Sequence, residues 1–153
     1  MKIKKINKSF FLILIFLSSM VLCSAAPKTK VLTPKNVNAS ISIVVSNKSL
    51  KYYPLSFDES SVLTTRGPGK LKIITRGHLK SKNEKSVAYN VYYRINGAKK
   101  IKVEFNSVNS DDKAFFSDAS FGFPSGGDNI IIELPRGEHT IELWSGSKNI
   151  KIS

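Results

Sequence analysis

Apolar and polar residues alternate along most of the chain beyond residue 38, in short runs separated by Gly, Pro, Asn and Ser. A period of two residues is typical of a β-strand with one buried face. The spacing of the turn signals predicts one all-β domain of roughly seven to nine strands, an antiparallel two-sheet sandwich. The expected strands cover residues 39–45, 50–57, 61–66, 70–76, 129–134, 139–144 and 147–152, with two more inside 87–105.

The clearest hairpin lies within residues 87–105, around Asn96-Gly97. A two-residue loop there would place the apolar residues of the two strands on opposite faces. A three-residue loop, 95–97, pairs Val91 with Ile101 and keeps both apolar sets on one face, because cross-strand neighbours share a face. We therefore expect a three-residue loop with Gly97 in a left-handed conformation, and Ile95 exposed at its tip.

Turn signals also divide the other strands. Gly67-Pro68-Gly69 predicts a turn between 61–66 and 70–76. Residues 135–138 predict a hairpin connection that sets Ile132 opposite Ile141. A turn at 145–146 would then lead into a last strand at 147–152.

Two stretches resemble segments of exported bacterial proteins with immunoglobulin-like or fibronectin-like sandwiches. They are GPGKLKIITR, residues 67–76, and LPRGEHTIEL, residues 134–143. The resemblance implies an immunoglobulin-like β-sandwich and transfers no catalytic residue. The cysteine pair of the disulfide-bonded immunoglobulin domains is missing, since the chain has one cysteine.

The N-terminus has the pattern of an export signal. A lysine-rich start precedes the apolar run 10–22, and small residues follow at 24–26. We expect a cleaved signal peptide over 1–26, an extended basic tether over 27–38 and a single domain over 39–153. The protein would then be periplasmic, cell-surface or extracellular, without a transmembrane span in its mature form. Lipid anchoring at Cys23 is an alternative, although Leu22 before it suits such a site poorly.

The chain is strongly basic, with a formal net charge of +13 at pH 7. An exported basic protein tends to meet anionic partners, here an anionic polysaccharide, a lipid surface or an envelope protein. The alternative is a set of solvated lysines, because the excess is spread along the chain. Motifs of nucleic-acid binding are absent from the sequence, so no specific nucleic-acid recognition is expected.

The residues that carry catalysis or bind metals are scarce. With two histidines and one cysteine, the sequence predicts neither a metal site nor a cofactor. His139 falls on the apolar phase of its strand, across from Leu134, and His78 lies in the polar loop 77–86, which we expect to be exposed. The protein is therefore not expected to be an enzyme. A hydrolase acting on envelope or extracellular polysaccharide, with Glu133 and Glu142 as its acid pair, is an alternative function.

Candidate contact residues lie on the outward phases of the strands. Tyr92 falls opposite Lys100 in the three-residue register, with Lys102 further along, and Trp144 is on the polar phase of its own strand. Exposed aromatics on a sheet face are typical platforms for sugar rings and protein partners.

The long stretch 106–128 carries four phenylalanines, which either plug the core or form a recognition surface; they are Phe115, Phe116, Phe121 and Phe123. Its aspartates lack the spacing of a calcium-binding loop. These features favour a non-catalytic binding or accessory module with an unknown ligand. A structural subunit of an envelope assembly is the other alternative.

Overall fold

The computed structural model describes residues 29–146, and the chain divides into two units, 1–31 and 32–153. Of the first unit, only residues 29–31 are described, and they have no regular secondary structure. In the second unit every strand pairing is antiparallel, which confirms the predicted all-β class. The predicted strand over 147–152 lies outside the described residues. No described helix is long and apolar enough to span a membrane.

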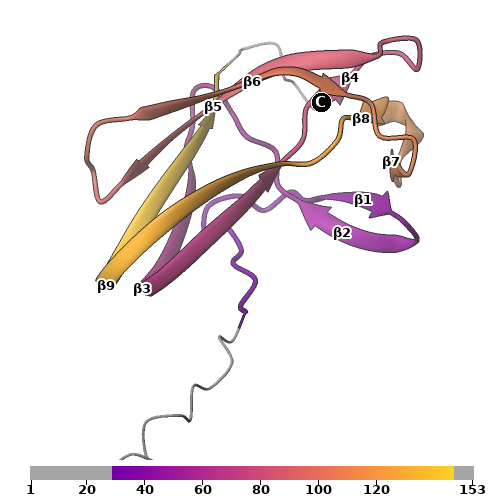
Figure 1. Ribbon diagram of the computed structural model, residues 1–153. Coiled ribbons are helices and arrows are strands. Elements are labelled where there is room, and N and C mark those ends of the chain that lie inside the picture. Colours follow the sequence, from indigo (N-terminus) through magenta and orange to yellow (C-terminus); the bar gives the residue numbers. More distant parts are fainter. Residues whose placement is uncertain (1–28, 147–153) are drawn as a thin grey trace, which may run out of the picture. The chain divides into compact units, whose positions relative to one another are not determined.

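The strands form sheets of three, four and two strands (Figure 1). Their orders are β2-β1-β7, β3-β9-β5-β6 and β4-β8. The elements are β1 (Ile41–Val45), β2 (Lys48–Tyr52), β3 (Ser61–Thr75), β4 (His78–Leu79), β5 (Ser86–Ile95), β6 (Ile101–Asn109), β7 (Ala114–Phe116), the 3-10 helix η1 (Ala119–Phe121), β8 (Phe123–Pro124) and β9 (Asp128–Ser145).

β3 and β9 are the longest strands, and they pair with each other along almost their whole length. Both bend at the same place, where the register shifts between Gly67 and Gly69 (Figure 1). We call residues 61–67 and 137–145 the first arm of this ribbon, and residues 69–75 and 128–134 its second arm. The turns predicted at 67–69 and 135–138 are therefore wrong. Gly and Pro mark bulges inside strands as well as turns between them.

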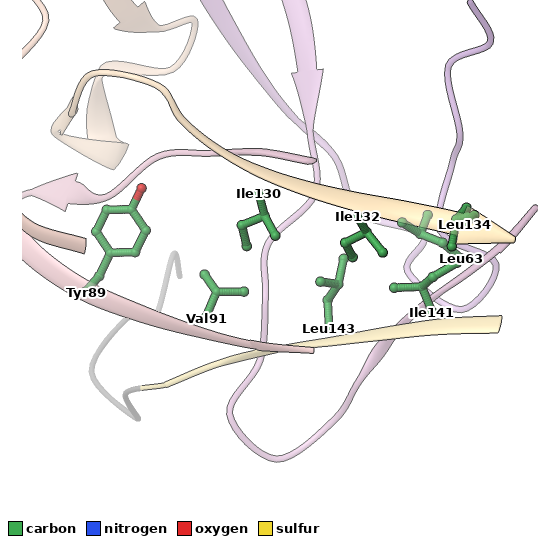
Figure 2. Close-up of a cluster of buried hydrophobic side chains, with 8 residues drawn as sticks. All are labelled: Leu63, Tyr89, Val91, Ile130, Ile132, Leu134, Ile141 and Leu143. Carbon is green, nitrogen blue, oxygen red and sulfur yellow. The ribbon is translucent and has the colours of Figure 1, made fainter. Parts of the chain in front are cut away.

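The main core lies between the two arms. Figure 2 shows Ile130, Ile132 and Leu134 of the second arm directed toward the first arm, where Ile141 and other buried side chains lie. Burial of each such side chain contributes about 1.5–3 kcal/mol. Ile132 and Ile141 thus share one core, but they are not hairpin neighbours as predicted. Leu63, Tyr89, Val91 and Leu143 complete the buried cluster.

The hairpin of β5 and β6 has the predicted faces in a different register. Val91 pairs with Val103, two residues from the predicted partner Ile101, and residues 96–100 connect the strands. The predicted three-residue loop is wrong because β6 begins at Ile101, three residues later than a loop over 95–97 requires. Ile95, predicted at a loop tip, is half-buried in the sheet and pairs with Ile141 of β9.

The sheet β2-β1-β7 has a smaller core of its own. β1 confirms the strand predicted at 39–45, and β2 is an edge strand that ends before Pro54. Ile43, Ala114 and Phe116 form the buried cluster. β7, η1 and β8 show that the predicted irregular stretch 106–128 contains regular elements.

Two segments, one predicted as an exposed loop and the other as an extended tether, are held by the domain. Leu79, in the predicted loop 77–86, is fully buried in β4, so the exposed loop is wrong at this point. In the predicted tether 27–38, Lys35 N donates to Val62 O at 2.9 Å. Asn36 also accepts a 2.8 Å hydrogen bond from Val62 N, so the tether is fixed here along the edge of β3.

Candidate functional site

Three of the predicted contact residues form one row on the four-stranded sheet. Tyr92 on β5 lies between Trp144 on β9 and Lys102 on β6 as their cross-strand partner. All three project from the side of the sheet opposite the main core, which we call the outer face. The predicted partner of Tyr92, Lys100, was wrong because the hairpin register is shifted. Lys102 takes its place.

Lys100 reaches the same face from the connection 96–100. Its Nζ lies 3.7 Å from the centroid of the Trp144 ring, and the Arg94 guanidinium carbon lies 5.2 Å from it. Both distances are within the range of cation–π interactions. Trp144 is only 7% exposed, although it is on the outer face. The expectation of an open aromatic platform is therefore wrong for Trp144.

Arg94 is a member of the site that the sequence reasoning missed. It lies two residues after Tyr92 on the same strand, so the alternation alone places both side chains on one face. Its cross-strand partner is Glu142, and the two side chains make a double contact. Arg94 Nη2 donates to Glu142 Oε1 at 2.8 Å, and Nε donates to Oε2. Such a planar fork holds the guanidinium in a fixed orientation.

The Arg94 hydrogen bonds hold the pKa of the Glu142 carboxyl below its usual value, with smaller contributions from Ser60 and the charge of Lys100. Glu133 lies on the second arm and pairs there with Lys70 at 2.8 Å. The two glutamates suggested as an acid pair are thus engaged in separate ion pairs on different arms. Nor does any group of three or more His, Cys, Asp or Glu that could hold a metal ion occur within residues 29–146.

We expect Glu142 to titrate below the usual value of about 4.3 in the folded protein. Because the folded pKa is depressed, the pair stabilises the fold above the unfolded pKa and loses this contribution as pH falls through the folded pKa. A carboxyl NMR titration of wild type and Arg94→Gln measures this. The variant should titrate near the usual value, whereas Lys102→Gln should match wild type. Equal midpoints in wild type and Arg94→Gln would contradict the assigned cause.

The four phenylalanines of 106–128 have different surroundings. Phe116 is buried in the smaller core, and the Phe121 ring packs against it at 5.9 Å between centroids. Phe115 is 53% exposed and Phe123 37% exposed. None of the four belongs to the four-stranded sheet, so the structure does not assign them to the face around Trp144.

A buried arginine fixes the long connection beside that smaller core. The side chain of Arg76 is 9% exposed, and its Nη1 donates to Ser125 O at 2.6 Å and to Asp111 Oδ2 at 3.1 Å. Its Nε donates to the Tyr52 hydroxyl at 3.1 Å. Both Nε and Nη1 of Arg76 donate to acceptors of the protein itself, so the cluster stabilises the fold.

A second polar cluster lies at the end of the main core. The Tyr89 hydroxyl donates to Asp128 Oδ2 at 3.1 Å and lies 3.0 Å from Thr75 Oγ1, which must then be its donor. Burial raises the pKa of the Tyr89 hydroxyl, which keeps it protonated as a donor.

Both histidines have structural partners. His139 is buried, as its phase predicted, but it pairs with Thr65 of β3 and not with Leu134. Its Nε2 lies 2.9 Å from Pro135 O and its Nδ1 3.2 Å from Asn96 Nδ2. His78 is half-buried and its Nε2 contacts Phe121 O, so the solvated role expected for it is wrong.

Comparison with protein-family models, curated proteins and solved structures gave no match. The site is therefore interpreted from its own geometry, as an aromatic pair on an outer sheet face with cations around it.

Proposed function

We propose that this chain is an exported, non-catalytic binding or accessory module that acts at the cell envelope or outside the cell. The observation that carries the proposal is the row of Trp144, Tyr92 and Lys102 across three strands. Side chains from three parts of the sequence meet on one outer face, and two further cations cover the tryptophan. Aromatic and arginine side chains are enriched where proteins bind partners.

The fold suits this role as a rigid support. The two arms of β3 and β9 enclose one core, which favours a two-layer sandwich, and we propose that its layers are arranged as in immunoglobulin-like domains. A site on strands is held more firmly than one on loops. Export is favoured by the sequence of residues 1–26, which lie outside the described residues.

The test uses the full chain, expressed in an exporting bacterial host. Intact mass of the exported form identifies its N-terminus and shows whether Cys23 carries lipid. The purified protein is then measured against acidic polysaccharides, neutral polysaccharides and anionic lipid vesicles. We expect at least one class to bind, and Tyr92→Ala with Lys102→Ala to weaken binding by about tenfold or more.

Lys72→Ala is the matched control, because Lys72 is an exposed lysine on the second arm, away from the four-stranded sheet's outer row. It should bind as wild type does. If no class binds, or if the control loses as much affinity as the double variant, this face is not the binding site.

A further inference from the structure

The buried position of Trp144 is unusual for the outer face of a sheet. A tryptophan on the outer face of a sheet is expected to be open, yet this ring is 7% exposed. The groups over it are the charged ends of Arg94 and Lys100, which extend from β5 and from the connection 96–100. Charged side chains are thus part of the cover over this ring.

These two cations are held in different ways. Arg94 is fixed by its double contact with Glu142. Lys100 is exposed and lies in the connection 96–100, three residues after Gly97, which has a φ of 72°. Within residues 29–146 its ammonium forms no ion pair, and its contacts are with the Trp144 ring and, at longer range, the charge of Glu142. Lys100 is therefore the cation that can leave the ring at the smaller cost.

We propose that Lys100 is a displaceable cap over Trp144, and that the face binds an anionic polysaccharide whose carboxylates draw Lys100 off the ring. This inference rests on the proposed function and names its ligand class. A charge-assisted hydrogen bond to a carboxylate is stronger than a contact with an aromatic face. The uncovered ring then stacks against the apolar face of a sugar ring, with Tyr92 as its neighbour on the next strand.

The surroundings favour a polysaccharide over the other anionic partners. Glu104 and Glu142 lie on the same face as Lys102 and Arg94, so cations and carboxylates alternate across it. The closely spaced phosphates of a nucleic-acid duplex, one charge per about 1.7 Å, would meet these carboxylates as well as the cations. A polysaccharide with one carboxylate per sugar ring can contact the cations and avoid the carboxylates. A membrane surface needs apolar side chains that enter the lipid, whereas the Trp144 ring lies beneath charged groups.

The test uses Trp144 itself, because it is the only tryptophan in the chain. Acrylamide quenching of its fluorescence is compared between wild type, Lys100→Ala and Lys99→Ala. Removing the cap should raise the quenching constant about twofold or more, since the ring loses the cation that covers it. Lys99→Ala is the control, because it removes the neighbouring charge without touching the ring. Quenching of Lys100→Ala equal to wild type overturns the cap, whatever the protein binds.

The second experiment uses galacturonic acid oligosaccharides and their methyl esters, in which a methyl group replaces the negative charge of each carboxylate. Wild type should bind the acid form about tenfold more tightly or better, and Lys100→Ala should bring the two affinities within about threefold, because its ring is open to both. Anionic phosphatidylglycerol vesicles and duplex DNA are measured in parallel. If either binds and the oligosaccharides do not, the polysaccharide assignment is overturned. If nothing binds while quenching rises, the proposed function fails and the ligand class with it.

Discussion

Ile141→Ala is expected to remove most of the stability of the domain. Ile141 is fully buried, pairs with Leu63 on one side and Ile95 on the other, and lies in the core between the two arms (Figure 2). Truncation removes buried methyl groups and leaves a cavity. β9 cannot move to close it, because the strand is paired with β3 on one side and β5 on the other. A loss of about 4 kcal/mol in the free energy of unfolding is expected, in the upper part of the range for such changes. Urea unfolding of the exported protein measures it.

Ile131→Ala is the matched control, the same change on the same strand. Ile131 is 61% exposed on the second arm, so its truncation should change the free energy of unfolding by about 0.5 kcal/mol or less. Equal losses in the two variants would mean that the arms do not enclose the core in this way.

The class of fold and the buried faces could be predicted from the sequence, because both depend on local alternation. Ile130, Ile132 and Leu134 are buried while Ile131 and Glu133 between them are exposed, as the period of two requires. The hairpin shows where this information ends. Alternation distinguishes odd from even pairings, but a shift by two residues leaves every side chain on the same face.

The path of the long ribbon could not be predicted in this way. Gly and Pro at 67–69 and at 135–137 give the same local signal whether the chain reverses or two paired strands bend together. The difference is decided by the pairing of β3 with β9, whose residues are far apart in the sequence. The local signal favours a hairpin, whereas the bent ribbon places Ile130 and Ile132 in one core with Ile141.

The candidate site was predictable residue by residue but not as an assembly. The alternation of apolar and polar residues placed Tyr92 and Trp144 each on the outward face of its own strand. Their contact depends on the non-local pairing of β5 with β9. The cover over Trp144 depends on the five-residue connection that brings Lys100 back across the sheet. No periodicity in the sequence reports such a side-chain contact.

Gly67→Ala, at the bend of the ribbon, is expected to cause the second large loss in the free energy of unfolding. A Cβ built on Gly67 would lie 1.9 Å from Pro135 O and 3.0 Å from Leu134 O. Both are backbone atoms of the paired strand, so the overlap cannot be relieved by a side-chain rotation. The two strands must separate at the bend, where their register shifts. A loss of about 3 kcal/mol is expected, at the upper end of the usual cost of overpacking.

Gly69→Ala separates this steric argument from a general need for glycine at the bend. Gly69 lies two residues further along β3, and an added Cβ would meet no atom within 4 Å. Neither glycine has a positive φ, so alanine fits both backbones and only the space around them differs. Gly69→Ala should be neutral or slightly stabilising, because it restricts the unfolded chain. Thermal and urea unfolding of both variants decide the matter: if Gly67→Ala is as stable as Gly69→Ala, the strands do not approach this closely, and the bent ribbon is wrong.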